Sequence, residues 1–230
     1  MIATTSKSVP NHLSKREIAE ISIRNAIETG LYKPGQVVSQ RQISEDLGLS
    51  VTPIREAILV LTSNGIVERH KHQSIKVSEV NSEKLRQLFS VRHMIEEEAV
   101  RLAATNADDT LVGELQRLND MLSKCSEETD PEEINSLDRR FHGLVFGASG
   151  NEALVWTIDR VKSSFPMYAL WREPGRVATS AHEHQQIIDA LRERDGEKAA
   201  SAQRMHLSKG LDATIVYLER KLKATASLAE

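Results

Sequence analysis

The segment SQRQISEDLGLSVTPIREAI, residues 39–58, predicts two short helices joined by a tight turn. Residues 39–42 have the S-x-x-Q spacing of a capping box, in which each of the two side chains bonds the backbone N–H of the other residue. The helix that begins there ends at Gly48, because glycine readily takes the left-handed conformation common at helix C-termini. Ser50 caps the next helix, and Pro53 is tolerated in its first turn because an N–H there has no helical partner.

The residues on either side of this segment add a third helix and a hairpin. Ser14 and Glu17 have capping-box spacing and open an amphipathic helix predicted over residues 14–28. Downstream, residues 66–69 and 74–77 are predicted to form two short strands around a polar turn, and we find β signals only there. The order helix, helix, turn, helix, hairpin is that of a winged helix-turn-helix.

The rest of the chain has a helical pattern interrupted by short polar or Gly/Pro junctions. The predicted helices are 82–105, 109–127, 131–148, 151–170, 177–194 and 197–223. Segments spaced so evenly predict an antiparallel helical bundle. We therefore expect a mainly α protein made of a flexible lead-in (1–13), a winged helix-turn-helix domain (14–79), an all-α helical domain (80–224) and a C-terminal tail (225–230).

Composition and charge narrow the class of protein. Hydrophobic residues make up 40% and charged residues 27%, which is typical of a globular protein. The apolar runs are far shorter than the ~20 residues of a membrane span, and residues 1–12 lack the apolar core of a signal peptide. Cys125 is the single cysteine, so no internal disulfide forms. We expect a cytoplasmic protein without a membrane partner.

Residue types at the start of the second helix of the turn suit contacts with DNA. In a helix-turn-helix this helix lies in the major groove, with its N-terminal residues against base edges and phosphates. The charge distribution supports a DNA partner only for the N-terminal part of the chain. Residues 1–80 hold 10 Lys/Arg and 8 Asp/Glu, whereas the whole chain has a net charge of −3. The same side chains also suit a solvated surface. The expected DNA contacts are Arg41, Ser50, Thr52, Arg55, Lys71 and His72.

Several motifs follow one another in a fixed order here, namely IRNAI (23–27), GLYKPG (30–35), SQRQIS (39–44), LGLS (47–50) and TPIREAI (52–58). Over about residues 14–78 they resemble the GntR superfamily of bacterial regulators, which implies DNA contacts at Arg41, Ser50, Thr52 and Arg55. Two positions depart from that family, which usually has arginine at Val51 and glycine at Gln73. Loss of a bidentate guanine contact removes about 1–3 kcal/mol of discrimination, so we expect an operator unlike the usual one.

Four polar residues of the helical part lie on apolar or tightly packed helix faces. Asp138 and His142 are four residues apart and share an apolar face, where a carboxylate is costly unless it is paired or bound to a metal. His184 lies on an apolar stripe and His206 in a column of small residues, whereas His182 should face solvent. One aspartate and three histidines suit a divalent ion such as Zn, Ni or Mn. Each histidine taken alone also suits a hydrogen-bonded core residue.

The motifs VRHMIE (91–96), DRRFH (138–142), EHQQII (183–188) and MHL (205–207) resemble the FCD ligand-binding domain of the FadR-like branch, over about residues 82–220. Asp138, His142, His184 and His206 stand at the four positions that hold the metal ligands in that family. It implies a bundle of six or seven helices that binds a metal and a small organic or sugar acid and dimerises the regulator. Arg92 matches an arginine that often lines the pocket, and its guanidinium suits a carboxylate. An ion pair with Glu96 at i+4 is equally consistent with the sequence.

These observations predict a DNA-binding transcriptional regulator and no enzyme. A homodimer on a pseudo-palindromic operator is expected, since one short recognition helix contacts few bases. A metal-dependent enzyme is one alternative, because a His/Asp site can activate water. Glu183 is the nearest candidate base for that chemistry, yet it lies about 100° around the helix from His184. A purely structural helical module fused to the DNA-binding domain is the other alternative.

Overall fold

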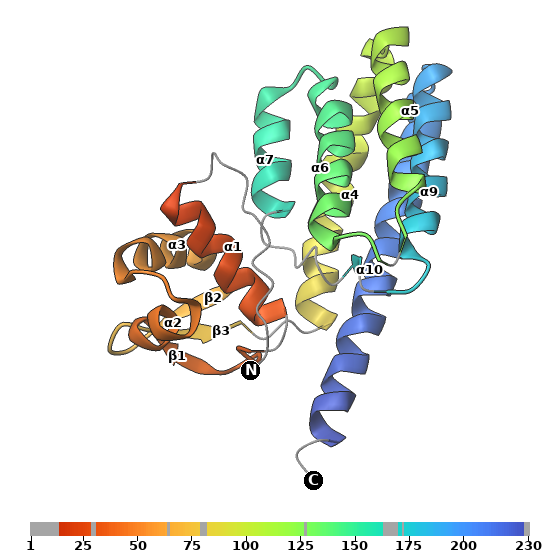
Figure 1. Cartoon of the computed structure of the whole chain (residues 1–230). Helices are drawn as coiled ribbons and strands as arrows, with labels where there is room; N and C mark the ends of the chain where they lie inside the picture. Colours follow the sequence, from red (N-terminus) through yellow and green to blue (C-terminus); the bar gives the residue numbers. More distant parts are fainter. Residues whose placement is uncertain are drawn as a thin grey trace. The chain divides into compact units, whose positions relative to one another are not determined.

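The computed structural model describes residues 14–28, 31–63, 65–78, 82–126, 128–162, 170–171 and 173–227 (Figure 1). The chain divides into two compact units, Met1–Val80 and Asn81–Glu230, and each unit has an apolar core of its own. Several expectations fall outside the described residues: the lead-in over 1–13, the domain boundary at 79/80, residue 127 at the end of the predicted helix 109–127, the 163–169 part of the predicted helix 151–170, and residues 228–230 of the predicted tail.

The first unit is a winged helix-turn-helix built on one apolar core. Its elements are α1 (Lys15–Glu28), β1 (Val37–Ser39), α2 (Gln40–Leu47), α3 (Val51–Ser63), β2 (Val67–His70) and β3 (Ser74–Val77). Ile23 of α1, Ile43 of α2 and Ile54 of α3 are fully buried in that core. The three helices therefore form around a shared interior, with the sheet supplying further apolar residues such as Ile75.

Local sequence sets the ends of these helices. Ser14 and Glu17 form a reciprocal capping box, in which the Ser14 N–H donates to Glu17 Oε2 at 2.8 Å and the Glu17 N–H donates to Ser14 Oγ at 3.2 Å. Ser39 caps α2 by accepting from the Gln42 N–H at 3.1 Å. Gly48 ends α2 with a φ of 65°, the left-handed conformation that the sequence predicts for it.

The sheet contains one strand that the sequence does not reveal. Its order is β1-β3-β2 with both pairs antiparallel, whereas only β2 and β3 are expected. The additional strand is three residues long and buries only Val38 among them, too short a run to show a period-two pattern. At the wing tip His72 and Gln73 have φ of 56° and 55°, which explains why glycine is usual where Gln73 stands.

The second unit is an all-α bundle, with helices that run side by side in Figure 1. Its elements are α4 (Ser82–Asn106), α5 (Asp109–Ser123), α6 (Pro131–Gly147), α7 (Glu152–Lys162), α9 (Arg176–Arg192) and α10 (Gly196–Ser227). The longest, α10, packs along α4 and α9, while α5 packs between α9 and α6. Gly196 permits the close approach of α10 to α4, because a Cβ there would lie 3.1 Å from the Arg101 backbone oxygen.

Two predicted helix ends in this unit are wrong. The helix predicted over 109–127 ends at Ser123, because the Ser126 N–H bonds the Thr129 side chain at 2.9 Å in a polar turn that competes with helix. The tail predicted from residue 225 is helical as far as Ser227. Within the described part of the chain, no helix has both the length and the apolar character needed to cross a membrane.

Candidate metal centre

The four predicted metal ligands meet inside the bundle. Asp138 and His142 come from α6, His184 from α9 and His206 from α10, and all four residues are buried, with exposures of 5% or less. One ligand atom from each lies within 4.8 Å of the other three. Three helices therefore converge on a single point through side chains that the sequence places on inward faces.

The spacing of the ligand atoms suits a small divalent ion. Nε2 of His142 is 3.2 Å from Nε2 of His206, and Asp138 Oδ1 is 3.6 Å from His142 Nε2 and 3.5 Å from His184 Nε2. Zinc bonds of about 2.0–2.1 Å in a tetrahedron would place neighbouring ligand atoms about 3.3–3.4 Å apart. Three of the separations lie close to that value and all four ligand atoms lie within 4.8 Å of one another, so these residues suit a metal that draws the wider pairs together.

Unsatisfied polar atoms in the cluster support the same conclusion. Among the described residues, no hydrogen-bond partner meets Asp138 Oδ1 or either ring nitrogen of His184. A buried polar atom without a partner costs about 1–3 kcal/mol, so such atoms rarely gather at one place without a reason. A bound cation would satisfy the carboxylate oxygen and one imidazole nitrogen at once.

Aromatic packing fixes the orientation of the imidazoles. The ring of Phe141 stacks on His184 with centroids 4.0 Å apart and an interplanar angle of 8°. The ring of His142 stacks on Phe146 with centroids 5.5 Å apart. Both phenylalanines are on α6, so the helix that supplies the aspartate also holds two of the three histidine rings in place.

Burial keeps two of the imidazoles in the form that binds metal. It lowers the pKa of His142 well below its ordinary value, and the positive charge of Lys162 lowers this pKa further. Burial also lowers the pKa of His184 well below its ordinary value. Because a metal binds the neutral imidazole, the folded protein does not have to lose a proton from these two rings at neutral pH.

A buried ion pair between Arg176 and Glu183 lies beside the cluster and is not predicted from the sequence. Glu183 is fully buried on α9 and accepts hydrogen bonds from Arg176 at 2.8 and 3.1 Å and from Nδ1 of His206 at 2.8 Å. The expected angle between Glu183 and His184 on their helix does not reveal that the carboxylate meets α10. The sequence does hold a sign of the ion pair: Arg176 and Glu183 are seven residues apart, which places them on the same face of a helix.

Arg92 makes the ion pair that the sequence leaves open. Its Nε donates to Glu96 Oε1 at 2.6 Å and its Nη2 to Oε2 at 3.4 Å, with both residues buried. Gln203 of α10 adds a third hydrogen bond to Glu96 at 2.9 Å. The guanidinium therefore already holds one carboxylate in the bidentate manner expected for the acid.

The predicted DNA contacts lie on the surface of the winged unit. Ser50, Thr52 and Arg55 are exposed around the first turn of α3, and Val51 beside them is 44% exposed. Three further residues are also exposed: Lys71 and His72 in the wing turn, and Arg41 on α2, which pairs with Glu45 at 2.9 Å.

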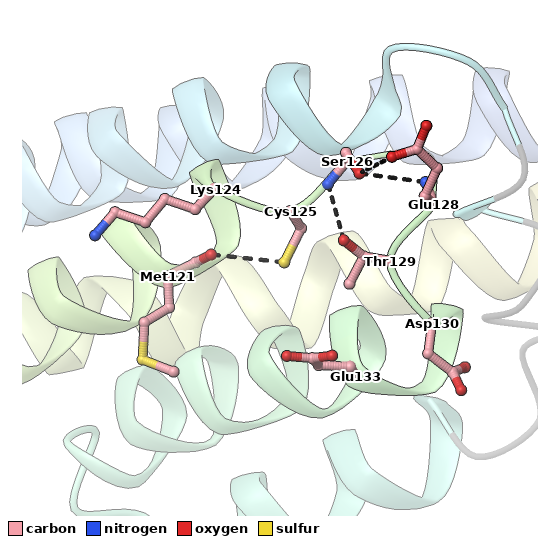
Figure 2. Close-up of a pocket in the computed structure, with 8 residues that line it drawn as sticks. All are labelled: Met121, Lys124, Cys125, Ser126, Glu128, Thr129, Asp130 and Glu133. Atoms are coloured by element: carbon pink, nitrogen blue, oxygen red, sulfur yellow. Dashed lines mark hydrogen bonds between the residues drawn. The ribbon is translucent and has the colours of Figure 1, made fainter. Parts of the chain in front are cut away.

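A separate cavity of about 440 Å³ opens at the turn between α5 and α6 (Figure 2). It contains none of the four clustered ligands. Acidic side chains dominate its polar wall, which disfavours an anionic acid. Burial and the nearby Glu133 raise the pKa of the Cys125 thiol, so this cysteine remains protonated at neutral pH. The lining residues are Met121, Lys124, Cys125, Ser126, Glu128, Thr129, Asp130 and Glu133.

Known proteins resemble the chain along both units. The sequence matches the family described as bacterial regulatory proteins, gntR family, over residues 15–77, and the FCD domain over residues 87–209. It is 27% identical over 190 residues to the HTH-type transcriptional regulator McbR of Escherichia coli (strain K12), covering 81% of this chain and 86% of McbR. The Glc operon transcriptional activator of the same organism is 29% identical over 221 residues, with coverage of 84% and 87%. The solved structure of E. coli McbR/YncC gives a TM-score of 0.68 at 25% identity, covering 92% of this chain and 100% of that one.

Proposed function

The chain belongs to the GntR family of bacterial regulatory proteins and carries an FCD domain, and on this premise we propose that a small organic or sugar acid controls its affinity for a specific operator. The protein is a DNA-binding transcriptional regulator. The acid binds in the helical unit at a metal centre formed by Asp138, His142, His184 and His206. Since the operator is bacterial DNA, the protein works in the cytoplasm.

The observation that carries this proposal is the convergence of four buried ligand atoms within 4.8 Å of one another. A neutral imidazole and a carboxylate are good ligands for Zn, Ni or Mn, and the chemistry does not select among these ions. When bound, the ion supplies a fixed positive charge and, if it is five- or six-coordinate, one or two positions for a carboxylate. Asp138 alone contributes a negative charge to the ligand set, so a divalent ion leaves a net positive centre that attracts an acid.

Arg92 is the candidate partner for the remaining oxygens of the acid. Its charge lies near the cluster, since it contributes to lowering the pKa of His142. Because the guanidinium of Arg92 already pairs with the Glu96 carboxylate, an incoming carboxylate must share or displace this ion pair. We expect binding of the acid to rearrange the contact of α4 with α10, where Gln203 also holds Glu96.

DNA binding is assigned to the exposed face of the winged unit. Ser50, Thr52 and Arg55 reach base edges in the major groove from the start of α3. Arg41 contacts a phosphate, and the wing residues Lys71 and His72 contact the backbone or the minor groove. Two copies of the chain present two such faces to a pseudo-palindromic operator.

The proposal is tested by comparing His184→Ala with His182→Ala in untagged protein. His184 is a buried ligand, whereas His182 is exposed two residues away on the same helix and is the matched control. We expect His184→Ala to lose metal and the response to acid while its operator binding persists, and His182→Ala to behave as wild type. Metal content is measured after supplying Zn, Ni and Mn, and ligands are found by a thermal-shift screen of small carboxylic and sugar acids. A wild-type protein with near-zero metal occupancy would falsify the metal centre.

A further inference from the structure

Three buried residues form a hydrogen-bonded chain that ends on a metal ligand. Arg176, the first residue of α9, donates through Nη1 and Nη2 to the two carboxylate oxygens of Glu183, at 3.1 and 2.8 Å. Glu183 Oε2 lies 2.8 Å from Nδ1 of His206 on α10. The exposures are 4%, 0% and 5%, so water does not compete for these bonds.

This chain fixes which nitrogen of His206 carries the proton. Both carboxylate oxygens of Glu183 accept hydrogen bonds from the Arg176 guanidinium, which is the bidentate arrangement of an ionised carboxylate. An ionised carboxylate only accepts, so His206 Nδ1 is the donor in its 2.8 Å contact with Glu183, which is much shorter than the 3.5 Å from Arg176 Nη2 to the same nitrogen. In the neutral imidazole the other nitrogen, Nε2, then has a free lone pair, and Nε2 is the atom that faces His142 across 3.2 Å in the cluster.

The other two histidines of the cluster lack such a partner. His142 Nδ1 and His184 Nδ1 meet no hydrogen-bond acceptor in the ranges that the structure describes. His206 is therefore the histidine whose tautomer the surrounding protein specifies. A ligating histidine commonly donates its second N–H to a carboxylate, and loss of such a partner typically costs about 10–100-fold in metal affinity.

We propose that Glu183 is the positioning residue of the metal centre, which holds His206 as an Nε2 ligand while Arg176 holds Glu183 in place. This inference rests on the proposed metal site and adds to it a residue that does not touch the ion. It also links the start of α9 to the centre, because hydrogen bonds connect Arg176 through Glu183 to His206.

The test compares Glu183→Gln with the matched control Glu96→Gln in the full-length protein. Both glutamates are fully buried and both pair with an arginine, but Glu96 bonds Gln203 and no ligand histidine. The two variants therefore share the loss of a buried charge. Titrated with Zn²⁺ alone, Glu183→Gln should bind about 10–100-fold more weakly than Glu96→Gln. Equal affinities in the two variants overturn the proposal.

A second measurement, of the His206 tautomer, uses the metal-free wild-type protein and therefore does not depend on whether a variant folds. The ¹⁵N shifts of the His206 ring in the metal-free wild-type protein report its tautomer at mildly alkaline pH. A proton on Nδ1 supports the proposal, and a proton on Nε2 overturns it even if Glu183→Gln fails to fold. If the wild-type protein binds no Zn²⁺, the proposed metal centre fails, whereas the ring shifts still decide the role of Glu183.

Discussion

Val51 is an apolar residue on the surface where α3 begins, between two hydroxyl side chains that are also exposed. A valine there offers only methyl groups to a base pair, whereas an arginine offers a bidentate contact with guanine. We expect Val51→Arg to shift the preferred base at the facing operator position toward guanine while changing overall affinity less. Sequence selection from a random DNA pool, performed with both proteins, measures that preference. An unchanged preference would show that this residue does not face the bases.

Arg55 is predicted to contact a base, whereas Arg41 is predicted to contact a phosphate. Arg55→Ala should weaken binding to the selected operator by about 1–3 kcal/mol, because it removes a base contact. Arg41→Ala should weaken binding to every sequence alike and reduce the salt dependence, because a phosphate contact releases a counterion. Fluorescence anisotropy at several salt concentrations separates the two effects. If both variants bind as wild type does at fixed salt, the winged helix is not the DNA-binding surface.

At the scale of elements, the four candidate metal ligands come from three helices and meet at one point. Two ligands come from α6 and one each from α9 and α10, so a bound ion fastens these helices together. Zinc at a free concentration of 100 times its Kd should raise the free energy of unfolding by about 2.7 kcal/mol. Chelation should reverse the gain. Urea unfolding of wild type and His184→Ala checks this, and an equal gain in both would contradict the site.

Elements defined by local contacts could be predicted closely from the sequence. Ser39 and Gly48 bound α2 because a cap and a left-handed residue act on their own neighbours. The three-residue strand β1 could not be foreseen, since its pairing partner β3 lies far along the chain and only Val38 is buried.

In the candidate site, too, features set by one helix could be predicted from the sequence, and features set by contacts between helices could not. Asp138 and His142 share a face of one helix, so their periodicity predicts that both point inward. The sequence draws attention to Glu183 only as a candidate base, and its contact with His206 was missed because His206 belongs to a different helix. For Arg92 the sequence permits both a neighbouring glutamate and an external acid, and only packing shows that Glu96 occupies the fork.

At the scale of the whole molecule, we predict a two-fold dimer on a pseudo-palindromic operator. The helix α3 is 13 residues long and its predicted base contacts, Thr52 and Arg55, lie near its start, so one copy reads few base pairs. Two-fold symmetry doubles that contact set. Light scattering of the full-length protein, free and bound to DNA, should give twice the mass of one chain. A monomer in both states would contradict the prediction.

The arrangement of the ligands has a consequence for how a newly made chain matures. In the winged unit a side-chain bond such as Tyr32 to Asp46 spans 14 residues, whereas His142 and His206 meet across 64. Contacts between distant residues form late, and an N-terminal domain generally folds first during synthesis. We therefore expect the DNA-binding unit to be complete before the ribosome has added the last candidate ligand. For as long as metal loading lags behind synthesis, young chains should occupy operators while remaining insensitive to the acid.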